Sequence, residues 1–171
     1  MKKSLLIILS FSILSVCTVN GQSSRVDTIK PASSVYFELL GNGGFYSINY
    51  DSRFSKKRDG LGGRVGLSYA AESGDSFFSM PVGINYLAGK KGHYFEAGAG
   101  ITYYSANIYL LDNVGDSENG ENTTGVFGNL TFGYRKQPID GGFSLRAGVS
   151  PIITKNSFIP YWPYVSFGYT F

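Results

Sequence analysis

The stretch 164–171, which reads Tyr-Val-Ser-Phe-Gly-Tyr-Thr-Phe, decides the fold of this chain. Successive side chains of an extended strand point to opposite faces, so every second residue shares a face. One face here is apolar and aromatic and the other is mostly small and polar: Val165, Phe167, Tyr169 and Phe171 against Tyr164, Ser166, Gly168 and Thr170. Such a strand is typical of a closed sheet with lipid outside and a polar lumen inside.

The same alternation continues through most of the chain and predicts further strands of this kind. The expected strands are 33–40, 45–54, 60–70, 76–87, 93–110, 124–137, 142–154 and 161–171. Eight antiparallel strands close into a barrel whose interior is just filled by side chains. The sequence therefore predicts an all-β fold, an eight-stranded antiparallel up-and-down transmembrane β-barrel over residues 33–171.

The connections between the predicted strands differ in length. Residues 41–44 read Gly-Asn-Gly-Gly, a tight-turn sequence, and 89–92 and 138–141 are also turn-like. The segments 111–123 and 155–160 are expected to be loops, the first long and acidic. With both termini in the periplasm, these two loops would face outward, as in outer-membrane barrels. The turn at 41–44 would then be an unusually short outer loop.

The first 21 residues have the layout of a secretory signal peptide. Lys2 and Lys3 precede an apolar core at 5–16, which is shorter than the ~20 residues of a spanning helix. Cleavage before Gln22 would leave a short N-terminal lead at 22–32. Two alternatives stay open, namely a retained N-terminal anchor and a lipid attached to Cys17.

Composition excludes several classes of function. The only cysteine, Cys17, lies in the predicted signal, so the mature chain has no disulfide or thiol chemistry. The net charge of +3, to which Lys2 and Lys3 contribute, argues against nucleic-acid binding. The sequence has no zinc-ligand spacing, phosphate-binding glycine loop or nucleophile elbow. We therefore expect no catalytic residues, no cofactor and no metal, and a solvated role for the only histidine, His93.

Charged residues on the polar face of the strands predict what fills the lumen. An arginine facing lipid at mid-bilayer would cost about 2–4 kcal/mol, so these residues are expected to point inward. Carboxylates accept paired hydrogen bonds from arginine, which predicts a buried ion-pair network that plugs the lumen. A narrow polar path for small solutes is the alternative. The residues of the predicted network are Glu38, Arg53, Arg64, Glu96, Arg135 and Arg146.

Strand and turn motifs over most of the mature chain resemble those of known outer-membrane barrels. These motifs lie at 46–54, 81–90, 132–138, 141–151 and 167–171. They are similar to the small OmpA/OmpX-type barrels and, more specifically, to a group of uncharacterised outer-membrane β-barrel proteins of the Bacteroidetes. The terminal Phe171, with Tyr169 and Phe167, resembles the signal read by the barrel-assembly machinery. The resemblance implies a fold and carries over no catalytic residues.

Together these patterns predict a monomer in the bacterial outer membrane, in contact with lipid and lipopolysaccharide, with a structural or surface-recognition role. Three alternatives remain: a narrow porin-like channel, a lipid-modifying enzyme based on His93, and a soluble lipocalin-like barrel with its faces inverted. The acidic loop offers oxygen ligands for Ca²⁺. An EF-hand loop starting at Asp112 would, however, need glutamate where Thr123 stands.

Overall fold

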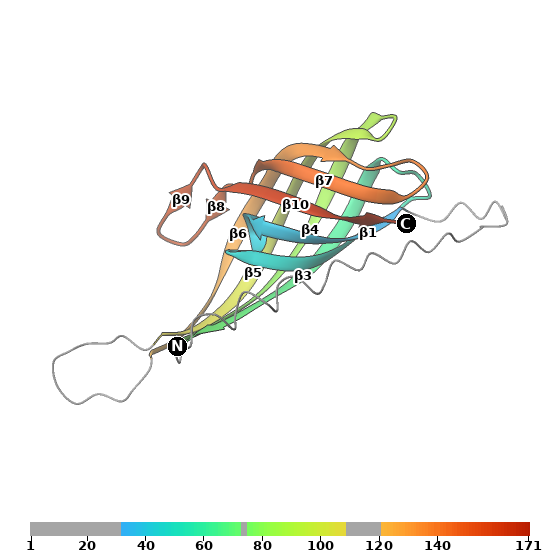
Figure 1. Ribbon diagram of the computed structural model, residues 1–171. Coiled ribbons are helices and arrows are strands. Elements are labelled where there is room, and N and C mark those ends of the chain that lie inside the picture. The colour runs from blue at the N-terminus through green and yellow to red at the C-terminus, as the bar shows by residue number, and fades with distance from the viewer. Residues whose placement is uncertain (1–31, 73–74, 109–120) are drawn as a thin grey trace, which may run out of the picture.

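The computed structural model is a closed β-barrel, and it describes residues 32–72, 75–108 and 121–171 (Figure 1). The predicted signal peptide, residues 22–31 of the predicted lead at 22–32, and most of the acidic loop lie outside the described residues. Within the described residues, no helix is long and apolar enough to cross a membrane.

Eight strands form the wall of the barrel. Each pairs antiparallel with its neighbours, and the pairings of β5 with β6 and of β1 with β10 close the ring. The prediction of an all-β, eight-stranded antiparallel barrel is confirmed. The strands are β1 (Ser33–Leu40), β2 (Tyr46–Arg53), β3 (Gly60–Glu72), β4 (Asp75–Lys90), β5 (His93–Ile108), β6 (Glu121–Lys136), β7 (Gly142–Val149) and β10 (Pro163–Thr170).

The alternation of the sequence sorts the side chains between the two faces of the wall. In β10, Val165 and Phe167 are exposed on the outside, whereas Ser166 and Thr170 are buried in the lumen. The other strands repeat this arrangement, so most of the buried side chains are polar or charged. Globular proteins in water bury apolar side chains instead. This barrel therefore has a polar interior and an apolar exterior.

The wall has two unequal halves. Strands β3 to β6 have 13 to 16 residues, whereas β1, β2, β7 and β10 have 8. The four long strands project beyond the short ones at the end away from the C-terminus (Figure 1). We call this the outer end, and the opposite end, which carries the C-terminus and the start of β1, the terminus end.

The hairpin of β7 and β10 differs from the prediction. The expected strand 142–154 ends at Val149, and two short strands follow, β8 (Ile152–Ile153) and β9 (Phe158–Ile159). The second lies inside the predicted loop 155–160. Pro151 lacks an N–H and interrupts the strand, although its carbonyl oxygen still accepts from the Leu130 N–H at 2.9 Å.

A bulge separates the two parts of this hairpin. Val149 pairs with Pro163 and Ile152 with Ile159, so two residues of one strand face three of the other. A β-bulge of this kind bends the hairpin. β8 nevertheless pairs with β6 in the same register as β7 does. The hairpin therefore continues the barrel wall at the outer end.

Candidate functional site: the barrel lumen

Asp51 of β2 faces the lumen and is completely buried. Its Oδ1 and Oδ2 accept from Arg53 Nη2 at 2.8 and 2.9 Å, and its Oδ1 also accepts from Arg135 Nη1 and Nη2, both at 3.0 Å. Asp51 and Arg53 share a face because they are two residues apart in a strand. Arg135 belongs to β6, four strands away around the ring in either direction. The contact therefore spans the barrel.

Asn85 of β4 joins the two carboxylates of the central network. Its Nδ2 donates to Asp51 Oδ2 at 2.6 Å and to Glu96 Oε1 at 2.7 Å, and its Oδ1 accepts from Arg53. Arg146 of β7 approaches the same Glu96 Oε1 at 3.6 Å through Nη1. The amide thus separates two negative side chains while arginines surround them.

A second group of side chains extends the network toward the outer end. Arg64 Nη1 of β3 lies 3.9 Å from Glu38 Oε2 of β1. The Arg146 guanidinium stacks 3.7 Å from the centre of the Tyr36 ring, a cation–π contact. Arg135 and Arg146 each donate to Ser34 Oγ at 3.0 Å. We call the charged side chains of both groups together the charge cluster.

The structure places all the predicted lumen residues in this cluster, together with one that the prediction missed. Asp51 alternates with Ser47, Asn49 and Arg53 in the sequence, and this spacing was the signal that could have revealed it. The cluster holds four arginines and three carboxylates, an excess of one positive charge. Some of its buried atoms have no hydrogen-bond partner among the described residues, among them Arg64 Nη2, Arg146 Nη1 and Glu96 Oε2.

Glycines on the inner face make room for these long side chains. A Cβ added at Gly62 would overlap the guanidinium of Arg53, and one at Gly66 would overlap the amide of Asn49. The glycines and the large polar residues thus occupy the same layers of the lumen. This explains why the polar face of the strands combines glycine with arginine.

The turn between β1 and β2 lies inside the outer end of the lumen. Its residues Gly41–Gly43 form one 3₁₀ turn (η1) that is buried inside the barrel. The side chain of Asn42 donates to Thr131 Oγ1 at 3.3 Å and accepts from Ser150 Oγ, and its carbonyl accepts from Thr102 Oγ1 at 2.8 Å. The expectation of a short outer loop is replaced by a turn that folds inward.

Two further hydrogen bonds hold this turn across the mouth. The Gly43 carbonyl accepts from Ser79 Oγ of β4 at 2.7 Å, and the Gly41 carbonyl accepts from Trp162 Nε1, next to β10, at 3.0 Å. The partners of the turn thus come from opposite sides of the ring. The turn thus lies at the outer end of the lumen, and the charge cluster lies below it.

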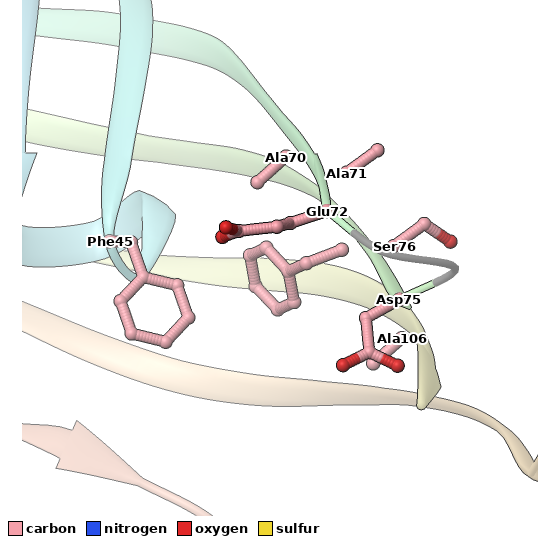
Figure 2. A pocket seen from close by; sticks show the side chains of 8 residues that line it. Phe45, Ala70, Ala71, Glu72, Asp75, Ser76 and Ala106 are labelled. Atoms are coloured by element: carbon pink, nitrogen blue, oxygen red, sulfur yellow. The ribbon is translucent and has the colours of Figure 1, made fainter. Parts of the chain in front are cut away.

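A hollow of about 450 Å³ opens at the outer end beside this turn (Figure 2). The rings of Phe45 and Phe77 meet edge to face in its wall, with centroids 5.7 Å apart. Glu72 and Asp75, which pair across β3 and β4, add two carboxylates. The outer end therefore presents aromatic and acidic groups side by side.

The other residues singled out by the sequence lie on the outside of the barrel. His93, at the first position of β5, is exposed at the terminus end, and its Nδ1 lies 2.5 Å from the Tyr134 hydroxyl. In the described part of the chain, no group of three or more His, Cys, Asp or Glu side chains is placed to hold a metal ion. Phe167, Tyr169 and Phe171 are exposed along the outer face of the last strand.

No protein-family model and no curated protein matches the sequence. Among solved structures, the chain is similar to the N-terminal β-barrel domain of Pseudomonas aeruginosa OprF, with a TM-score of 0.55 and 10% identity over 82% of this chain and 96% of that one. Ail, the attachment invasion locus protein of Yersinia pestis in complex with the heparin analogue sucrose octasulfate, gives a TM-score of 0.47 and 15% identity over 83% and 99% of the two chains. The similarity to the OprF domain shows that this chain has the fold of a small outer-membrane β-barrel.

Proposed function

We propose that this protein is a bacterial outer-membrane β-barrel with a plugged lumen and a structural or surface-recognition role. The observation that carries the proposal is the inverted wall, apolar on the outside and charged on the inside. Burying apolar surface away from water stabilises a protein by about 25 cal/mol per Å². A wall of exposed Val, Leu, Ile and Phe side chains is therefore more stable in contact with lipid than with water. A closed barrel also satisfies the backbone groups of every strand within lipid.

The turn at the outer end and the charge cluster support a plugged barrel. The charge cluster crosses the lumen through the contact of Arg135 with Asp51, and the turn crosses the outer mouth through Asn42. An eight-stranded barrel leaves little room beside such side chains. Passage of a solute would require both the turn and the ion pairs to move.

The outer end supports a recognition role. The long strands β3 to β6 project there, and the hollow beside Phe45 and Phe77 opens between them and the turn. On the other side of the mouth, Phe158 and Tyr161 are exposed, the latter by 81%. Exposed aromatic side chains near an otherwise polar end are suited to binding another molecule.

The proposal also covers processing, partners and origin. The signal peptide is removed before Gln22, and the barrel resembles those of the Bacteroidetes. Phe167, Tyr169 and Phe171 serve the assembly machinery, after which the monomer contacts phospholipid and lipopolysaccharide. It has no catalytic activity, so thin-layer analysis of membrane lipids should be the same for wild type and His93→Ala. A change in lipid composition that His93→Ala abolishes would contradict this part.

Membrane fractionation combined with gel mobility tests the barrel itself. We expect the expressed protein in the outer-membrane fraction, with a band that migrates differently before and after boiling. Planar-bilayer recording of the same preparation should show no stable opening. A soluble product without a heat-dependent shift would contradict the barrel, whereas a stable open pore at rest would contradict only the plug.

A narrow channel is the second candidate, and one observation favours it. Buried polar atoms such as Arg64 Nη2, Arg146 Nη1 and Glu96 Oε2 have no hydrogen-bond partner among the described residues. Buried polar groups of this kind are commonly satisfied by water. Water between the arginines would provide a path for small ions once the outer turn moved.

A further inference from the structure

Three basic side chains form a row on the outside of the barrel at the terminus end. Lys90 of β4 pairs directly with His93 of β5, and His93 pairs directly with Lys136 of β6. Direct cross-strand partners point to the same face, with Cβ atoms about 4.5–5.5 Å apart. All three residues are exposed. We call Lys90, His93 and Lys136 the basic row.

Among the residues that the structure describes, the basic row has no acidic partner. Within the described residues, neither Lys90 nor Lys136 forms a salt bridge. The Nδ1 of His93 is taken by the Tyr134 hydroxyl at 2.5 Å, which leaves Nε2 for another partner. The two lysines therefore place positive charge without a counter-charge on both sides of His93, and such a surface is suited to a bound anion.

The position of the basic row indicates which kind of anion it meets. The next outward-facing register positions are Ala88, Phe95 and Tyr134, where the apolar outer wall begins. An aromatic residue followed by a cationic one is the arrangement found where a bilayer changes from acyl chains to headgroups. A phosphate at this level would be part of a lipid whose chains lie against the same three strands.

The spacing of the row fits one phosphate group. β4 and β6 flank β5, so the backbones of Lys90 and Lys136 are about 10 Å apart. Two lysine side chains can converge from that distance on an anion held over His93. The hairpin that links β4 and β5 adds a further cation, because Lys91 occupies its tip in a left-handed conformation (φ 56°) before Gly92 (φ 84°). Asparagine or glycine is the usual residue at that position.

We propose that the basic row binds the phosphate of an anionic phospholipid, in the leaflet that surrounds the terminus end of the barrel. Lys90 and Lys136 donate to the phosphate oxygens, and His93 donates through Nε2. The acyl chains lie on the wall beside Phe95 and Tyr134. The inference rests on the proposed function in one respect, namely that the barrel spans a bilayer.

Native mass spectrometry of the mature protein, released from nanodiscs with equal amounts of phosphatidylglycerol and phosphatidylcholine, tests the proposal. We expect the wild type to retain phosphatidylglycerol preferentially. The double variant Lys90→Gln/Lys136→Gln should lower this preference by roughly thirtyfold, given the usual contribution of each basic residue at an anionic membrane surface. Lys90→Arg/Lys136→Arg should preserve the preference, and each single Gln variant should fall between.

The matched control is Lys56→Gln/Lys57→Gln, which removes the same charge from the exposed β2–β3 connection at the same end of the barrel. Equal losses in both double variants would mean general electrostatic attraction and would overturn the site. Displacement of the lipid by excess inorganic phosphate, with phosphate retained in its place, would overturn the lipid assignment.

A heat-dependent gel shift, recorded for each protein, separates this inference from the proposed function. If the wild-type protein shows the gel shift but retains both lipids equally, the proposed lipid site is refuted and the proposed barrel is not. A wild type without a shift contradicts the barrel itself. If a double variant loses its heat-dependent gel shift, it has failed to fold as a barrel. The lipid preference of the single variants Lys90→Gln and Lys136→Gln then decides whether the basic row binds the lipid.

Discussion

Asp51 receives more hydrogen bonds from charged groups than any other carboxylate described in the lumen. Asp51→Asn would keep the side-chain shape but leave Arg53 and Arg135 without their main counter-charge. Breaking a buried ion pair from one side costs about 3–5 kcal/mol, so we expect the free energy of unfolding to fall by that order. This loss of stability is measured as the urea concentration at which half of the protein no longer migrates as the folded band on unboiled gels. Asp140→Asn, at an exposed turn, is the control, and an equal midpoint in both variants would show that Asp51 is not the centre of the network.

A substitution at Gly62 tests whether Arg53 needs the space that the missing side chain of this glycine leaves. Gly62→Ala would place a methyl group on the guanidinium of Arg53 and should destabilise the barrel by about 1–3 kcal/mol through overpacking. Gly128→Ala is the matched control, since the nearest atoms to its new Cβ are 3.7 Å away. The same urea titration compares the two. A Gly62→Ala variant as stable as Gly128→Ala would mean that Arg53 has another position available.

At the residue scale, the sequence predicts which face of the wall a side chain lies on, but it does not predict which other side chains it contacts. The period of two was enough to assign Glu96 and Arg146 to the lumen. The bridging role of Asn85 could not be predicted, because it depends on how far neighbouring strands are staggered around the ring. The contact of Arg135 with Asp51 depends in addition on which strands face each other across the lumen.

At the scale of elements, the strands were predicted more accurately than the connections. β1 has the predicted limits, because the glycine-rich turn sequence 41–44 follows directly after Leu40. β9 was missed, since two residues are too few to show alternation. The inward course of the Gly41–Gly43 turn was also missed, because its glycines allow many conformations and the hydrogen bonds of Asn42 to distant strands select one.

The proposed plug, made of the turn and the charge cluster, predicts how the lumen responds to mutation. Asn42→Ala removes side-chain hydrogen bonds to Thr131 and Ser150 and loosens the turn, but it leaves the charge cluster in place. We expect no stable conductance from Asn42→Ala alone. Adding Arg135→Ala, which removes the contact across the barrel, should produce small openings in planar bilayers.

The control for this pair replaces the first mutation by one at an exposed position. Asn156→Ala in the β8–β9 turn removes the same amide without touching the lumen, so Asn156→Ala/Arg135→Ala should open less often than Asn42→Ala/Arg135→Ala. If the two double variants open equally often, the charge cluster alone keeps the lumen closed. If Asn42→Ala opens by itself, the turn alone keeps the lumen closed.

At the scale of the whole molecule, the two ends of the barrel differ in ways that predict its orientation. The outer end has the long strands, the aromatic hollow and the β8–β9 hairpin, whereas the terminus end has short connections and the lysines of the basic row. Outer-membrane barrels place short turns in the periplasm and long connections outside the cell. The outer end should therefore face the medium.

An epitope tag inserted after Lys155 tests this orientation on intact cells. The site lies in an exposed turn closed by the Thr154 N–H to Ser157 carbonyl hydrogen bond at 2.8 Å, where an insertion disturbs no wall pairing. A tag inserted after Lys56, in the exposed β2–β3 connection, is the matched control at the other end. We expect antibody to label intact cells only through the first tag and both tags after the cells are broken. Labelling of intact cells only through the Lys56 tag would reverse the barrel, place the basic row in the outer leaflet, and make the phosphates of lipopolysaccharide its partners in the cell.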